Sequence, residues 1–266
     1  MRRRRAFTIL EVLVAMSVTM VLSALMMQVL SHTSTLWSHT NESLDTFREA
    51  RAALQVMGRD LAQLRSMPQV PRTFPLLALE NHPETAPEDR VNQELYALVS
   101  TPNVGKADWC AIGYFCRWNQ ARKAFSLSRQ FTRSDTAFEK LGEVLNAKTP
   151  LSGARAFMAL YTRPDKDSDW GSVDDLATYC WDLQFVLPEK LTLPSTQQQE
   201  WPQGEFSQQL PAWIEVRCKV LGSLAARRLA GHPVTRDTWF DPASPLYQKL
   251  ILPYEQEFTT RISLAQ

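Results

Sequence analysis

The chain opens on one long apolar stretch, which is followed by a second stretch with helical spacing of its apolar residues. From Phe7 to Leu30 the only charged side chain is Glu11, and a helix of this length spans roughly 36 Å, enough for the ~30 Å hydrocarbon core of a bilayer. From Leu36 to Leu64 apolar residues recur at steps of three and four, which predicts an amphipathic helix. Pro68 ends the run because proline does not continue a helix. The stripe is too short and too often interrupted for a coiled-coil stalk, so we expect it to pack on a sheet of the same chain.

Beyond Pro68 the pattern indicates strands. Residues 67–104 are rich in Pro, Asn and Glu and are predicted to form a long connection. The runs CAIGYFCRW and AFSLSRQF flank the polar segment NQARK, which predicts a β-hairpin. The remaining expected elements are strands at 154–163, 178–188, 212–222 and 254–264, and a short helix at 224–229. The predicted fold class is α+β, with a long N-terminal helix packed on an antiparallel β-sheet head.

The charged residues before the apolar stretch predict its orientation in the membrane. Arg2, Arg3, Arg4 and Arg5 precede it, and the positive-inside rule places that end in the cytoplasm. We therefore expect a single-pass protein of the inner (cytoplasmic) membrane with a periplasmic or otherwise extracytoplasmic head. The formal net charge of the whole chain is only +1, which gives no reason to expect a nucleic-acid partner.

Two simpler interpretations explain less of the N-terminus. In a cleaved secretory or twin-arginine signal, the apolar run would be shorter and an A-x-A site would follow it. A plain signal anchor accounts for the arginines and the length but leaves Glu11 unexplained. A carboxylate costs roughly 2.5–3.5 kcal/mol at the centre of a membrane helix, and less near the interface, so a simple anchor gains nothing from it.

The segment RRRRA-FTILEVLVA resembles the prepilin-type N-terminus, in which a basic leader and a small residue precede Phe and, four positions on, Glu. The resemblance implies that a prepilin peptidase cuts between Ala6 and Phe7 and that the new amine is methylated. It also implies that Glu11 governs assembly, by pairing with the terminal ammonium of a neighbouring subunit. Most members of the family have Gly where this chain has Ala6.

Segments of the head extend the resemblance. The hairpin GYFCRW…FSLSRQF and the strand pair after it resemble minor pseudopilins of the J type, whereas TFREARAALQVMGRDLAQL and FTTRISLAQ are similar to Verru_Chthon cassette pilin-like proteins. This implies a leader at 1–6, a transmembrane helix at 7–30, its amphipathic continuation at 31–67 and a β-rich head at 68–266. The implied function is a subunit of a type II secretion or type IV pilus-like apparatus, with the peptidase, the membrane and other pilin-like subunits as partners. The alternative is a signal-anchored extracytoplasmic binding protein that does not assemble.

Few residues in the head suggest chemistry. Cys180 and Cys218 lie in neighbouring predicted strands on the oxidising side and are candidates for a disulfide; the alternative is buried free thiols. No HExxH, GxSxG or phosphate-binding glycine loop is present, so we predict no enzymatic activity.

A calcium site is the one cofactor that the sequence suggests at all. Asp165, Asp167 and Asp169 alternate as acids do in calcium loops, but Trp170 and Leu176 stand where an EF-hand has its Gly and Glu. A solvated acidic turn is therefore favoured, and no cofactor or metal is expected.

Overall fold

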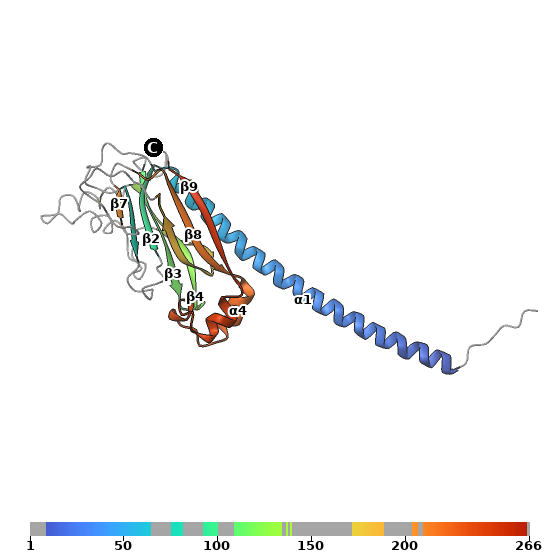
Figure 1. Cartoon of the computed structure of the whole chain (residues 1–266). Helices are drawn as coiled ribbons and strands as arrows, with labels where there is room; N and C mark the ends of the chain where they lie inside the picture. Colours follow the sequence, from blue (N-terminus) through green and yellow to red (C-terminus); the bar gives the residue numbers. More distant parts are fainter. Residues whose placement is uncertain are drawn as a thin grey trace, which may run out of the picture. The chain divides into compact units, whose positions relative to one another are not determined.

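The computed structural model describes residues 9–64, 76–81, 93–100, 109–134, 137, 139, 172–188, 204–206 and 210–264. The chain forms two compact units, Met1–Leu44 and Asp45–Gln266. A 53-residue helix, α1, runs through the boundary between them (Figure 1). In chain order the elements are α1 (Ile9–Leu61), β1 (Leu77–Asn81), β2 (Gln93–Ser100), β3 (Trp109–Asn119), β4 (Ala124–Thr132), β5 (Ser172–Thr178), β6 (Cys180–Val186), β7 (Gly204–Phe206), β8 (Trp213–Leu221), α4 (Ser223–Ala230), the 3₁₀ helix η1 (Asp237–Trp239), the π-helix η2 (Tyr247–Ile251) and β9 (Glu255–Ser263).

Six antiparallel strands form the larger sheet, sheet A, in the order β5-β4-β3-β2-β1-β7. The predicted hairpin is confirmed as β3–β4, paired from Ala111 with Thr132 to Asn119 with Ala124. Its turn is built from local chemistry: the Asn119 side-chain oxygen accepts a hydrogen bond from the Arg122 N–H at 3.0 Å. Lys123 then takes a φ of 51°, which returns the chain into β4.

The smaller sheet, sheet B, has the antiparallel order β6-β8-β9 and confirms three predicted strands. The chain changes from sheet A to sheet B at a single residue, Tyr179, which separates β5 from β6 and has a φ of 58°. The Tyr179 carbonyl accepts a hydrogen bond from the Leu221 N–H at 2.9 Å. The observed α+β layout, a long N-terminal helix with antiparallel sheets in the head, is the predicted fold class.

The prediction of one long connection over residues 67–104 was wrong, because β1 and β2 lie within it. β2 begins with Gln93 and Glu94, yet both are buried and bonded to remote or neighbouring groups. Gln93 accepts a hydrogen bond from the Phe185 N–H, and Glu94 accepts one from the Tyr96 hydroxyl. The remaining β2 residues are almost all buried, so the strand lacks the alternation that a half-exposed strand shows. The expected strand at 154–163 lies outside the described residues.

The core of the head is formed where the second part of α1 meets both sheets. Buried α1 side chains follow the predicted stripe, from Ala50 through Leu54 and Met57 to Leu61. On the β9 side, the Phe47 and Phe258 ring centroids are 5.7 Å apart, and a Cβ added at Gly58 would lie 3.8 Å from Ile262. Figure 1 shows this part of α1 beside β9. The helix therefore closes the apolar face that the strands leave open.

The residues between β8 and β9 close one end of the core. The predicted short helix is confirmed as α4, and it buries Ala225, Ala226 and Leu229. Trp239 packs edge-on against Trp181, with centroids 4.8 Å apart, and its indole N–H donates to the Lys123 carbonyl at 3.3 Å. Edge-to-face aromatic pairs add about 0.5–1.5 kcal/mol of stability beyond that from their buried area. This contact therefore holds the residues between β8 and β9 against sheet B.

One buried polar cluster joins α1 to sheet A. The Tyr114 hydroxyl and the Arg129 Nε both donate to Asp60 Oδ2, at 2.5 and 2.8 Å. Tyr114 and Arg129 are paired residues of β3 and β4, so the sheet presents both donors at one place. Burial, and then the Asp60 charge, raise the pKa of Tyr114 far above its ordinary value, so the hydroxyl remains a donor.

Removal of either donor should destabilise the head. For Tyr114→Phe we expect a loss of about 1–2 kcal/mol, because one hydrogen bond to a buried carboxylate disappears. For Arg129→Ala we expect about 3 kcal/mol, because the charge of Asp60 then lacks its counter-ion. Urea unfolding of the full chain in detergent, followed by tryptophan fluorescence, measures both. Arg48→Ala is the control, since the Arg48–Asp45 pair is 75% and 69% exposed. Equal losses for Arg129→Ala and Arg48→Ala would contradict a structural role for the cluster.

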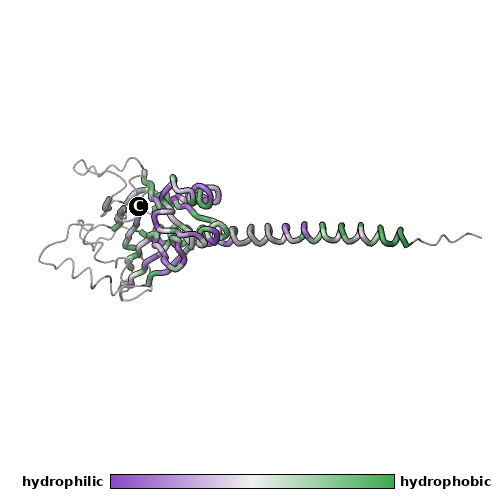
Figure 2. Tube along the Cα trace, turned by 90° about the horizontal axis from the view of Figure 1, so that it is seen from below, coloured by the Kyte–Doolittle hydropathy of each residue, from purple (hydrophilic) through white to green (hydrophobic). Residues whose placement is uncertain are grey.

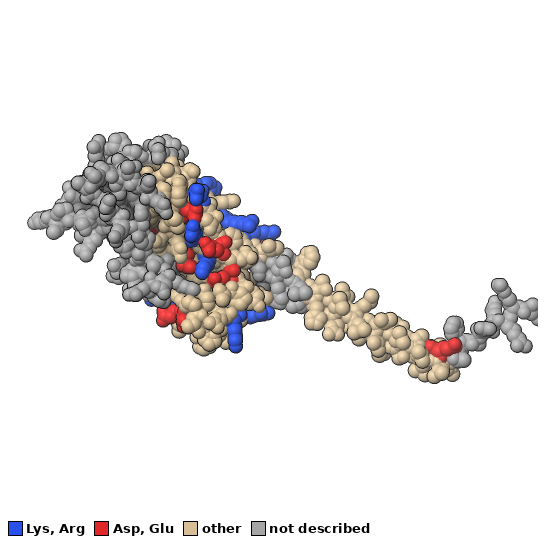
Figure 3. Space-filling model, in the orientation of Figure 1, with Lys and Arg blue, Asp and Glu red and all other residues tan. Residues whose placement is uncertain are grey.

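The outer face of sheet B carries paired charges, visible as neighbouring red and blue atoms in Figure 3. Glu215 accepts from Arg217 at 2.6 Å and from Arg261 at 3.0 Å, and Lys219 lies 3.4 Å from Asp182 and 3.3 Å from Glu255. The hydrogen bonds from Arg217, and then from Arg261, hold the pKa of Glu215 below its usual value.

This pairing predicts a contribution to acid sensitivity. Because the pKa of Glu215 is lower in the folded chain than in the unfolded one, its stabilising contribution is complete above the unfolded value of about 4.3. It is lost as the pH falls through the folded-state pKa. Midpoints of thermal unfolding between neutral and acidic pH should therefore fall less steeply for Glu215→Gln than for the wild type. Glu257→Gln, at an exposed position of β9, should follow the wild type; identical slopes for all three chains would contradict the pairing.

Candidate functional site

The first unit contains an apolar helical segment, Ile9–Ser34. Among the described residues, this is the one helical stretch that is long and apolar enough to cross a membrane. Its large side chains are exposed, for example Ile9 at 83% and Met20 at 75%, and Figure 2 shows the start of α1 in the colour of hydrophobic residues. Figure 3 shows the same stretch without basic atoms. So much exposed apolar surface requires lipid or other helices to cover it.

The hydroxyl groups in this segment are compatible with a hydrocarbon environment. Ser17 donates to the Val14 carbonyl, Thr19 to the Ala15 carbonyl and Thr33 to the Val29 carbonyl, each at 2.8 Å. In lipid no water satisfies such groups, so bonds back to the preceding helical turn make them tolerable.

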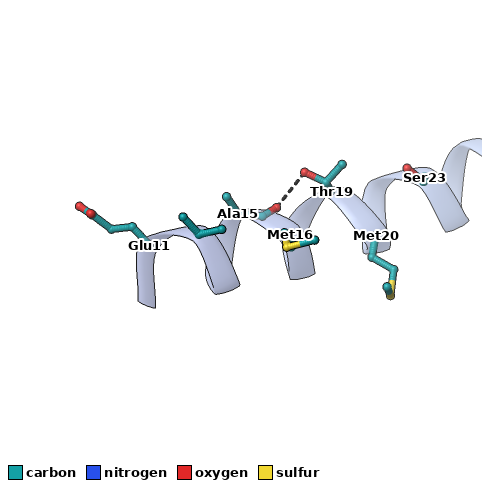
Figure 4. Close-up of a pocket in the computed structure, with 7 residues that line it drawn as sticks. Glu11, Ala15, Met16, Thr19, Met20 and Ser23 are labelled. Atoms are coloured by element: carbon teal, nitrogen blue, oxygen red, sulfur yellow. Dashed lines mark hydrogen bonds between the residues drawn. The ribbon is translucent and has the colours of Figure 1, made fainter. Parts of the chain in front are cut away.

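Glu11 lies near the start of α1 and begins a face that carries three small residues (Figure 4). Ala15, Thr19 and Ser23 follow it at four-residue steps, which place them on one side of a helix. Val12, Met16 and Met20 complete the lining of a shallow groove along this face. Small side chains let another helix approach closely in a membrane. Sequence reasoning missed this face, although the four-residue spacing after Glu11 was a readable signal.

The remaining residues predicted for processing lie outside the described part of the chain. These are Arg2, Arg3, Arg4 and Arg5 of the leader, and Ala6 and Phe7 at the expected cut. The same holds for the weak calcium candidates Asp165, Asp167 and Asp169. Among the described residues, no group of three or more His, Cys, Asp or Glu is arranged to hold a metal ion.

The two cysteines that were candidates for a disulfide lie in adjacent strands, as predicted. Cys180 is in β6 and Cys218 in β8, and the structure has both as buried free thiols. Cys110 and Cys116 both belong to β3 and are buried as well. The disulfide therefore stays a prediction, and Cys116, which sequence reasoning did not connect with the pair, lies beside Cys180.

Comparison with known proteins identifies the N-terminal segment. Residues 1–27 match the family model of the prokaryotic N-terminal methylation motif. No curated protein and no solved structure matches the chain. The motif supports a type IV pilin-like or pseudopilin precursor, and the family that it defines is structural rather than enzymatic. The α+β layout of helix and antiparallel sheets is consistent with a pilin-like fold. It also implies processing by a prepilin peptidase and association with a membrane and with pilin-like subunits.

Proposed function

We propose that this chain is a non-enzymatic minor pilin or pseudopilin, a subunit of a type II secretion or type IV pilus-like apparatus. The observation that carries the proposal is Glu11, an acid near the start of an exposed apolar helix and within the matched motif. A bulky, proline-rich head packs poorly into a long fibre, which favours a minor or tip subunit over a major one. The head's own resemblance to cassette pilin-like proteins or J-type pseudopilins remains part of this proposal.

The chemistry of assembly follows from the charges that the cut would create. Cleavage between Ala6 and Phe7 would leave an ammonium group two residues before Ile9, where α1 begins, and the first helical N–H groups carry partial positive charge. Glu11 lies four residues after Phe7 along the chain. In hydrocarbon, a carboxylate and an ammonium of neighbouring subunits stabilise each other, since both are costly to bury alone. The small-residue face that Glu11 begins would let the two helices come close enough for this contact.

The same proposal assigns the protein a cellular location and divides the chain into segments with separate roles. Arg2 to Arg5 would hold the leader, residues 1–6, in the cytoplasm of an inner-membrane precursor. Residues 7–30 would span the membrane, 31–67 would continue the helix and 68–266 would form the periplasmic or extracytoplasmic head. The competing candidate, a signal-anchored binding protein that never assembles, keeps its leader and has no terminal ammonium beside Glu11.

Processing can be measured directly. The chain is produced in membranes with a prepilin peptidase, or with a catalytically dead peptidase as the control, and its intact mass and N-terminal sequence are determined. We expect N-methylated Phe7 as the first residue only with the active peptidase. Ala6→Gly should increase the processed fraction, and Ala6→Leu should block it, because a small residue fits at the cut. A chain that starts at Met1 under every condition supports the simple anchor, and a start beyond residue 20 means ordinary signal cleavage.

Assembly tests Glu11 itself. Glu11→Ala should reduce incorporation into a filament, or cross-linking between subunits through the apolar helix, by about tenfold or more, because each copy loses at least ~1.4 kcal/mol of pairing. Membrane insertion should be retained, since the substitution makes the helix more apolar. Glu257→Ala, which removes an exposed carboxylate in the head, is the matched control and should assemble normally. Undiminished assembly of Glu11→Ala would overturn the proposed role.

A further inference from the structure

Three cysteine side chains come together inside the head, and we call Cys116, Cys180 and Cys218 the thiol cluster. They are 7%, 0% and 1% exposed, and all three belong to the main hydrophobic core. The Cys180 thiol is hydrogen-bonded to both of the others. Cys110, the fourth cysteine of the chain, lies six residues before Cys116 in β3.

The strands explain why Cys180 is the central member. Cys180 pairs with Val220 across β6 and β8, and Cys218 is two residues further along β8, so both point to the same face of sheet B. Cys116 shares a face of β3 with Tyr114, the face that turns toward the core. Strands β3 and β6 approach with Cα atoms within 8 Å. Cys180 therefore meets one thiol inside its own sheet and another across the two layers.

The Cys180–Cys218 contact is near the limit of disulfide geometry. A disulfide needs Cα atoms about 4.4–6.8 Å apart, and diagonal neighbours in a sheet are about 7–8 Å apart. The Cys180–Cys218 bond thus needs a small backbone adjustment. The irregular register between Trp181 and Gln184, where Asp182 has a φ of 54°, is a place where β6 can provide it. A Cys116–Cys180 bond would join strands β3 and β6, which have Cα atoms within 8 Å of each other, so it too requires the two strands to approach locally.

We propose that the thiol cluster is a thiol–disulfide exchange site in which Cys180 is the shared member, bonded on oxidation either to Cys218 within sheet B or to Cys116 across the sheets. The third cysteine keeps its thiol and can take over the bond by exchange. The proposal goes beyond the assembly role, and it depends on that role only for the oxidising compartment in which the head would reside.

The reaction requires an external disulfide, R–S–S–R, as the oxidant. One cluster thiol loses its proton and attacks a sulfur of R–S–S–R, which forms a mixed disulfide and releases RS⁻. A second cluster thiol loses its proton and attacks the protein sulfur of the mixed disulfide, which closes the internal bond and releases the second RS⁻. The two protons convert the two RS⁻ into RSH. The cluster is oxidised by two electrons and R–S–S–R is reduced by two.

Burial makes this exchange slow in the closed head. The hydrogen bond with Cys116, together with burial, raises the pKa of Cys180, and the hydrogen bond with Cys180, together with burial, raises that of Cys218. Because only a thiolate attacks, the folded head reacts mainly during local opening or while it folds. A bond formed then is protected from external thiols once the core has closed.

The test uses the full chain in detergent micelles, reduced and then incubated in glutathione buffers of graded oxidised-to-reduced ratio, with sub-denaturing urea to allow local opening. Remaining thiols are alkylated, and unreduced digests are mapped by mass spectrometry. In the wild type we expect two of the four thiols to be lost. Cys116→Ala should yield the Cys180–Cys218 bond, and Cys218→Ala should yield the Cys116–Cys180 bond. Cys180→Ala should keep all its thiols at every buffer ratio that oxidises the wild type.

Cys110→Ala is the matched control and should behave as the wild type. It also removes an ambiguity, because no Lys or Arg separates Cys110 from Cys116 and both fall on one tryptic peptide. An internal bond in Cys180→Ala, a dependence on Cys110, or four intact thiols in the wild type would each overturn the proposal. Near-ultraviolet circular dichroism shows whether Cys180→Ala is folded. If it is not, Cys116→Ala and Cys218→Ala still test whether Cys180 takes part in both bonds. No peptidase or partner subunit takes part, so failure here is distinct from failure of the assembly role.

Discussion

The apolar face of the second part of α1 has to be buried, and the arrangement of the head depends on that requirement. Sheet B has only three strands, which would leave its inner face open without a second layer. Helix α1 and sheet A provide this layer, and Asp60 determines how the helix is placed. A slip of one residue would turn Asp60 by about 100° away from Tyr114 and Arg129 and leave a buried charge without partners. Apolar packing thus supplies the attraction, while the carboxylate restricts it to one register.

The two parts of α1 are both helical, but the first exposes its apolar side chains and the second buries them. Residues 9–34 expose apolar side chains all round, and the hydroxyl groups of Ser17, Thr19 and Thr33 donate back to the helix itself, as a lipid-facing helix requires. The part from Asp45 onward buries one stripe and leaves charged residues such as Arg48 on the outside. Under the proposed assembly role, the first part of α1 would join subunits, while the second part belongs to the core of the head.

The passage from one sheet to the other gives the head a chemical feature that the assembly role does not use. At Tyr179 the chain leaves sheet A, and the next residue, Cys180, is already in the core between the layers. A covalent bond from Cys180 to Cys116 would tie the sheets together beside this crossing. A bond to Cys218 would instead tie only β6 to β8. The choice between the two bonds would decide how freely the layers move against each other.

Local patterns were sufficient for much of this protein. The apolar segment with Glu11, the β3–β4 hairpin, strands β6, β8 and β9, and helix α4 could all be predicted, because periodicity and turn residues act over a few neighbours. The match of residues 1–27 to the methylation motif was likewise readable from the offset of Glu11 to Phe7, whereas the assembly role of Glu11 stays a prediction. The small-residue face after it was equally local and was simply overlooked.

Only the tertiary structure decided the rest. Strands β1 and β2 form within a stretch that is polar and proline-rich in sequence, because β3 pairs with β2, β2 and β7 pair with β1, and a remote backbone group satisfies Gln93. The meeting of Asp60 with Tyr114 and Arg129, and of Cys116 with Cys180, joins residues more than fifty positions apart. The periodicity of apolar residues within one segment does not reveal such contacts. They exist because burial of the helix stripe and of both sheet faces brings distant strands into one core.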